Sequence, residues 1–97
     1  MRKNLRRFRK NQVVLGTGDV NNRSQQFKLP EEIFSLNKIS VYVNNKRWKR
    51  VDTLGDSSPS DRHYMVQREE GGELLIQFGD GANGSRLPSG KGNVTAT

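Results

Sequence analysis

The chain has 97 residues, of which 31% are hydrophobic and 28% are charged, and its formal net charge is +7. This length allows one small domain with a modest core, which buries roughly 60–70% of the surface that the unfolded chain exposes. The sequence has no Cys, which excludes a disulfide framework and a thiolate zinc site. No apolar run approaches the ~20 residues that cross a bilayer, so no membrane partner is expected.

The N-terminal residues 1–12 predict a basic flexible arm. Within the first ten residues there is no acidic side chain and there are six basic ones: Arg2, Lys3, Arg6, Arg7, Arg9 and Lys10. Residues 11–97 then hold 11 basic and 10 acidic residues, a balance of only +1. The arm lacks the apolar stretch of a secretory signal, which favours a cytoplasmic protein. Such an arm is typical of a segment that binds nucleic acid or an acidic neighbour in an assembly.

The first strands are predicted within residues 13–30. VVLGTGD is a brief apolar strand that ends in glycines and an Asp, and VNNRS is typical of a turn, because Asn tolerates left-handed backbone. QQFKLP predicts a second strand that Pro30 stops. The EEIFSLNK segment that follows predicts a short helical turn near residues 30–36, since Pro and Glu favour the first turn of a helix.

The clearest pattern is in residues 39–51. Ile39, Val41 and Val43 alternate with polar or amphipathic residues, which is the period of a half-buried strand. Asn44–Asn45 suits a two-residue hairpin turn, and KRWKRV is the expected return strand, with Trp48 packing across the hairpin.

Three more strands are predicted after the turn-forming loop DTLGDSSPSD: RHYMVQRE, ELLIQFG and GNVTAT. Six or seven short strands with hardly any helix predict an all-β domain over residues 13–97, either a small antiparallel sandwich or a partly open barrel. The core is expected to consist of the apolar residues of the central strands, namely Ile39, Val41, Val43, Trp48, Leu74, Ile76 and Phe78.

The segment LLIQFGDGANGSRLPSG contains a literal G-x-G-x-x-G at Gly79, Gly81 and Gly84. A dinucleotide loop needs a helix to begin there, so that the helix N-terminus holds the pyrophosphate. The following SRLPSGKGNV would break a helix at Pro88 and Gly90. The 13 residues after Gly84 also include no acid to hold a ribose. We therefore expect no nucleotide cofactor and no small-molecule substrate.

The alternative is that these residues shape a connection between two strands. Gly79 and Gly81 would let the chain leave the strand with positive φ, Asp80 would form an Asx-turn, and Leu87–Gly90 fits a type I turn with Pro at its second position. The residues expected to shape the loop are Gly79, Asp80, Gly81, Gly84, Pro88 and Gly90.

Other polar groups do not form a convincing catalytic or metal site. His63 is the only His, and its sequence proximity to Ser57 does not by itself imply a triad. The acidic and amide residues near Asp19 and Asp80 lack the bidentate Glu of a calcium loop. No catalytic residue, metal or cofactor is therefore expected.

Two side chains are candidates for contact with a partner. Trp48 lies between pairs of basic residues, so it is either a stacking site for single-stranded nucleic acid or the aromatic anchor of the hairpin. Arg86 is a long bidentate donor on a loop stiffened by its neighbours, which makes it a candidate interface anchor.

Most of the chain, about residues 13–97, resembles a segment of the baseplate assembly proteins (baseplate wedge, baseplate J-like) of contractile phage tails and phage-tail-like injection systems. The strings that carry the resemblance are VYVNNKRW, SPSDRHYMV, IQFGDGANGSRLPSG and NVTAT, preceded by VVLGTGDVNNRSQQFKLP. Members of that family are several times longer and continue beyond the last strand with an aromatic and a basic residue. The chain is therefore expected to be a fragment or a short relative.

The resemblance implies a structural, non-catalytic component of the baseplate wedge. Its partners would be other baseplate proteins in a hetero-oligomeric assembly, formed in the cytoplasm and located in a phage tail or tail-like particle. The alternative is a small nucleic-acid-binding β-module that uses the basic arm.

Overall fold

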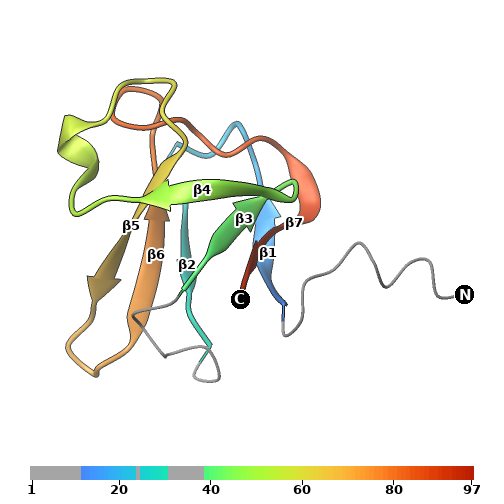
Figure 1. Cartoon of the computed structure of the whole chain (residues 1–97), viewed down its shortest axis with the longest axis vertical. Helices are drawn as coiled ribbons and strands as arrows, with labels where there is room; N and C mark the ends of the chain where they lie inside the picture. The colour runs from blue at the N-terminus through green and yellow to red at the C-terminus, as the bar shows by residue number, and fades with distance from the viewer. Residues whose placement is uncertain (1–11, 24, 31–38) are drawn as a thin grey trace, which may run out of the picture.

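The computed structural model describes residues 12–23, 25–30 and 39–97. In these ranges the chain forms seven strands and one 3₁₀ turn, which confirms the all-β prediction (Figure 1). The elements are β1 (Val13–Gly18), β2 (Gln26–Lys28), β3 (Val41–Val43), β4 (Lys46–Arg50), η4 (Leu54–Asp56), β5 (His63–Arg68), β6 (Leu74–Phe78) and β7 (Gly90–Ala96). The predicted helical turn near 30–36 and almost all of the basic arm lie outside the described residues. No described segment forms a helix long and apolar enough to cross a membrane.

The strands form one sheet in the order β1-β7-β3-β4-β5-β6-β2. The sheet curves into a nearly closed barrel whose two edges, β1 and β2, come together at Gly16 and Phe27. A Cβ on Gly16 would lie 2.7 Å from Cδ1 of the Phe27 ring, so the missing side chain makes room for the aromatic ring at this seam.

Of the two predicted architectures, the sheet is the partly open barrel, and it is mixed rather than wholly antiparallel, because β4 and β5 run parallel. Antiparallel strands can be joined by two residues, whereas a parallel pair needs a crossover of about a dozen. The connection between β4 and β5, residues 51–62, has this length and contains η4. β4 also changes its partner strand along its length. Trp48 pairs with Val41 of β3, whereas the next residue, Lys49, pairs with His63 of β5.

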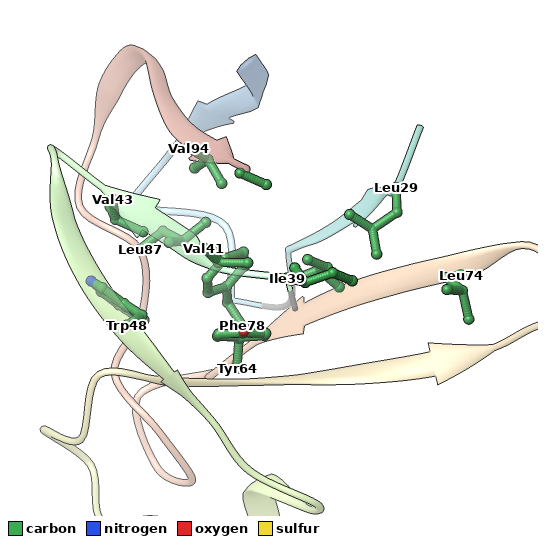
Figure 2. Packing of buried hydrophobic residues seen from close by; sticks show 12 residues of the cluster. Leu29, Ile39, Val41, Val43, Trp48, Tyr64, Leu74, Phe78, Leu87 and Val94 are labelled. Atoms are coloured by element: carbon green, nitrogen blue, oxygen red, sulfur yellow. The ribbon is translucent and has the colours of Figure 1, made fainter. Parts of the chain in front are cut away.

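The core is built around Phe78, which is only 1% exposed. Its ring makes edge contacts with Trp48 and Phe27, at centroid distances of 5.5 and 5.9 Å, and a tilted contact with Tyr64 at 6.2 Å. The predicted core residues are all buried (Figure 2). Six further buried apolar residues were not in that set: Leu29, Leu54, Tyr64, Leu87, Val94 and Ala96.

The hairpin between β3 and β4 confirms the predicted Asn-Asn turn. Asn44 and Asn45 have φ values of 53° and 65°, which is the pair of left-handed residues that a type I′ turn requires. We expect Asn45→Ala to lower the free energy of unfolding by about 1 kcal/mol, because Ala is strained in this region. Asn45→Gly should keep or slightly raise it. Urea unfolding with an unchanged m-value would measure the difference, and an Ala variant as stable as the Gly variant would contradict the prediction.

Candidate functional site

Three loops meet at one end of the barrel, at the top of Figure 1. They are residues 19–23 with Gln25, residues 51–62 and residues 79–89, and we call them together the three-loop platform. Backbone hydrogen bonds join the second loop to the third: Gly84 N donates to Ser58 O at 3.1 Å, and Ser85 N donates to Asp61 O at 2.8 Å. Because each loop is held by another, the platform presents a fixed surface despite having almost no regular secondary structure.

Arg86 joins the third loop to the first. Its Nε donates to Asp80 O at 3.1 Å, and its Nη1 donates to Val20 O at 3.2 Å. Val20 N in turn donates to Ser89 Oγ at 2.9 Å. The half-buried Arg86 therefore uses two of its donors inside the chain, and its first role is to hold the platform together.

Asp80 forms the predicted Asx-turn. Its Oδ1 accepts hydrogen bonds from the backbone N–H groups of Ala82 and Asn83, both at 2.8 Å. These bonds, the one from Asn83 first, lower the pKa of the Asp80 carboxyl below its ordinary value of 3.8, because they favour the ionised form.

This lowered pKa predicts a pH dependence of stability. A carboxyl whose pKa is depressed by folding stabilises the protein above its unfolded pKa, and the contribution is lost as the pH falls through the folded pKa. Asp80→Asn keeps an acceptor oxygen but has no charge to titrate. Compared with the wild type, it should lose less stability in urea unfolding as the pH falls from 5 to 2.5 through the ordinary pKa of an Asp carboxyl. Parallel losses in the two proteins would assign the acid sensitivity to other carboxyls.

The three glycines of the loop have different functions. Gly81 and Gly84 have φ values of 94° and 93°, and Gly81 N donates to Gly84 O at 2.9 Å, so they reverse the chain. The prediction of positive φ is confirmed at Gly81 and wrong at Gly79. Gly79 is needed for close approach instead, since a Cβ there would lie within 2.5 Å of Gly84 Cα.

The predicted type I turn at Leu87–Gly90 is also wrong. Residues 85–89 contain no turn or bend, and Gly90 is the first residue of β7. Two contacts keep the segment extended: Leu87 is buried in the core at 1% exposure, and Pro88 O accepts a hydrogen bond from Asn93 Nδ2 at 3.0 Å. The reversal is already complete at residues 81–84, so no second turn is needed.

Two amide side chains that sequence reasoning missed complete the platform. Asn93 Oδ1 accepts from Gly18 N at 2.8 Å, which links β7 to the end of β1. Gln25, which is 9% exposed, accepts from Asp19 N through Oε1 and donates to Thr17 O through Nε2. A polar residue within a strand and another directly before a strand give no distinctive sequence signal, because such residues are usually solvated.

Ser57, Asp61 and His63 come together at the base of the second loop. Ser57 Oγ lies 2.8 Å from His63 Nδ1, and Asp61 Oδ2 lies 3.9 Å from the same nitrogen. In a catalytic triad the hydroxyl and the carboxylate contact opposite ring nitrogens. Ser57 is also buried, so this cluster has the geometry of a loop anchor rather than of a nucleophile.

Trp48 is the aromatic anchor of the hairpin. Its side chain is 5% exposed and packs against Phe78, which leaves too little of the ring for a nucleic-acid base to stack on. The four basic residues of β4 are exposed around it: Lys46, Arg47, Lys49 and Arg50.

Within the described part of the chain, no three His, Asp or Glu side chains are grouped so that they could hold a metal ion. After Gly84 the chain continues into β7 and not into a helix, so the glycine loop lacks the helix N-terminus of a dinucleotide site. A hollow of about 200 Å³ between η4 and the third loop, lined in part by Thr53, Leu54 and Asn83, is smaller than the roughly 300–1,000 Å³ of small-molecule pockets.

Comparisons of the chain with protein-family models, with curated proteins and with solved structures found no match.

Proposed function

We propose that this protein is a structural, non-catalytic component of the baseplate of a contractile phage tail or tail-like particle, and that it contacts neighbouring baseplate proteins through the three-loop platform. One observation supports this proposal: the segment that carries the resemblance also builds the platform. The string IQFGDGANGSRLPSG, which carries much of the resemblance to baseplate proteins, is the same segment that forms the third loop and joins it by hydrogen bonds to the other two.

A fixed loop surface suits a role in which the chain holds other proteins in place. A pre-organised surface loses little conformational entropy on binding. The platform also exposes an apolar side chain, Val20, which is 45% exposed beside the Arg86 contact, and the small side chain of Ala82 at the tip of the third loop.

The test is binding to tail proteins encoded beside this chain, measured with purified components. Val20→Asp and Ala82→Arg change the exposed surface of the platform and leave the hydrogen bonds of these two residues in place, because those bonds use their backbone N–H and C=O groups. We expect each variant to weaken binding at least tenfold. Glu70→Arg, on the exposed β5–β6 hairpin, is the control and should change affinity less than twofold. Equal effects of all three variants, or no binding to any tail protein, would reject the proposal.

The second candidate, a nucleic-acid-binding module, is favoured by one observation, the six basic residues without an acid in the first ten. It predicts binding to an oligonucleotide that weakens steeply with salt and disappears when residues 1–10 are deleted. Binding that survives the deletion would exclude the arm as the binding element.

A further inference from the structure

β4 carries an unusual density of positive charge for a central strand. Four of its five residues are basic and exposed, and the fifth, Trp48, is buried. The ion pairs of the described residues join Lys28 to Glu73 and His63 to Asp61. Among the described residues, Lys46, Arg47 and Lys49 therefore take part in no ion pair, although the charge of Lys49 helps to lower the pKa of the Asp61 carboxyl.

A hollow of about 280 Å³ opens at this strand. It is lined by Ile39, Arg47, Trp48, Lys49, Arg50 and Tyr64. The hollow lies where β4 leaves β3 and begins to pair with β5, because Val41↔Trp48 is the last pair on one side and Lys49↔His63 is the first on the other. The exchange of partner strands thus produces an apolar floor with a cationic rim.

The dimensions and chemistry of the hollow define its ligand. Its volume is below the roughly 300–1,000 Å³ of pockets that enclose small molecules, but it can receive one apolar side chain. Guanidinium and ammonium groups at the rim bind carboxylates through charge-assisted hydrogen bonds. We propose that β4 binds an acidic peptide segment of a partner protein, which places one apolar side chain in the hollow and carboxylates on Arg47 and Lys49.

A peptide fits this surface better than single-stranded nucleic acid. Binding of single strands depends on aromatic faces on which bases stack, whereas Trp48 and Tyr64 are only 5% and 2% exposed. These buried rings provide a floor for an aliphatic group but almost no stacking area. The inference is carried by β4 and its hollow alone, so it does not depend on the baseplate proposal or on the three-loop platform.

Trp48 is the only Trp of the chain, so its fluorescence reports directly on the hollow. The experiment titrates the full chain with the capped peptide Glu-Glu-Leu-Glu-Glu and follows the emission of Trp48. The same titration uses a peptide with Gly in place of Leu, one with Gln in place of every Glu, and an oligo(dT) strand. The protein variants are Arg47→Gln with Lys49→Gln and, as a control matched in charge, Arg68→Gln with Lys91→Gln, two exposed basic residues outside the hollow.

We expect a saturable change in Trp48 emission that weakens with salt. The dissociation constant should rise at least tenfold in the Arg47/Lys49 variant and less than twofold in the Arg68/Lys91 variant, and both altered peptides should bind more weakly than the parent. Absence of binding, equal effects of the two double variants, or binding without a change in Trp48 emission would overturn the proposal. The last two would place the peptide on another basic surface, such as the arm. Tighter binding of oligo(dT) with the same fluorescence change would overturn it in favour of nucleic acid.

Discussion

Phe78→Ala is expected to remove about 3–5 kcal/mol from the free energy of unfolding, the usual cost of deleting a buried Phe. The expected value is at the upper end, because Phe78 is 1% exposed and contacts three aromatic rings from β2, β4 and β5. The free energy of unfolding of small domains is only about 5–15 kcal/mol. The variant should therefore have a much lower thermal midpoint than the wild type. Circular dichroism and urea unfolding would measure the loss.

Phe27→Ala is the comparison for this prediction. Phe27 is half-buried at the β1–β2 seam and has one described ring contact, with Phe78. Phe27→Ala should lower the free energy of unfolding clearly less than Phe78→Ala does. If both variants lose the same free energy, the stability of the barrel depends on closure of the seam rather than on the ring cluster around Phe78.

Gly79→Ala is expected to destabilise the protein by about 3 kcal/mol or more, at or above the upper end of the usual cost of overpacking. The added Cβ would collide with the backbone of Gly84, which cannot move as a flexible side chain does. Relief of the clash would separate Gly79 from Gly84, and the bond from Gly84 N to Ser58 O would be lost with it. The variant should therefore also disorder the third loop, which loss of the amide NMR signals of residues 80–86 would reveal.

The β5–β6 hairpin provides matched controls for Gly79→Ala. A Cβ on Gly71 would meet nothing within 4 Å, and its φ is not in the left-handed region. Gly71→Ala should therefore be neutral or stabilise by up to about 1 kcal/mol through the unfolded state. Gly72 has equal space but a φ of 88°, so Gly72→Ala should cost about 1–2 kcal/mol from backbone strain alone. Any other order of the three variants would show that close approach is not the function of Gly79.

The features predicted correctly from the sequence are those that depend on neighbouring residues. Alternation in residues 39–43 and the Asn44–Asn45 pair specify the hairpin, because side-chain direction and turn type follow from local chemistry. The Asx-turn at Asp80 is local in the same way, since its acceptor and donors are two and three residues apart.

The features that could not be predicted depend on residues distant in the sequence. The direction of β5 follows from the path of residues 51–62, which is fixed by the burial of Leu54 and by the contact of Ser58 with Gly84. Trp48 could be assigned to the core or to a binding surface until Phe78 was placed beside it. Gly79 illustrates the same limit, because a glycine after a strand indicates either positive φ or close packing, and only the position of Gly84 separates the two.

The pairing of β1 with β7 has a consequence for how this protein is made. Val13 lies opposite Ala96, so strands near the two ends of the described chain share a ladder, and β7 is inserted between β1 and β3. On a ribosome, β1 therefore lacks its hydrogen-bonded partner strand until residues 90–96 have left the exit tunnel. Because such distant pairings slow folding, we expect nascent chains stalled before residue 90 to remain sensitive to protease, and sheet closure to follow translation of the last strand.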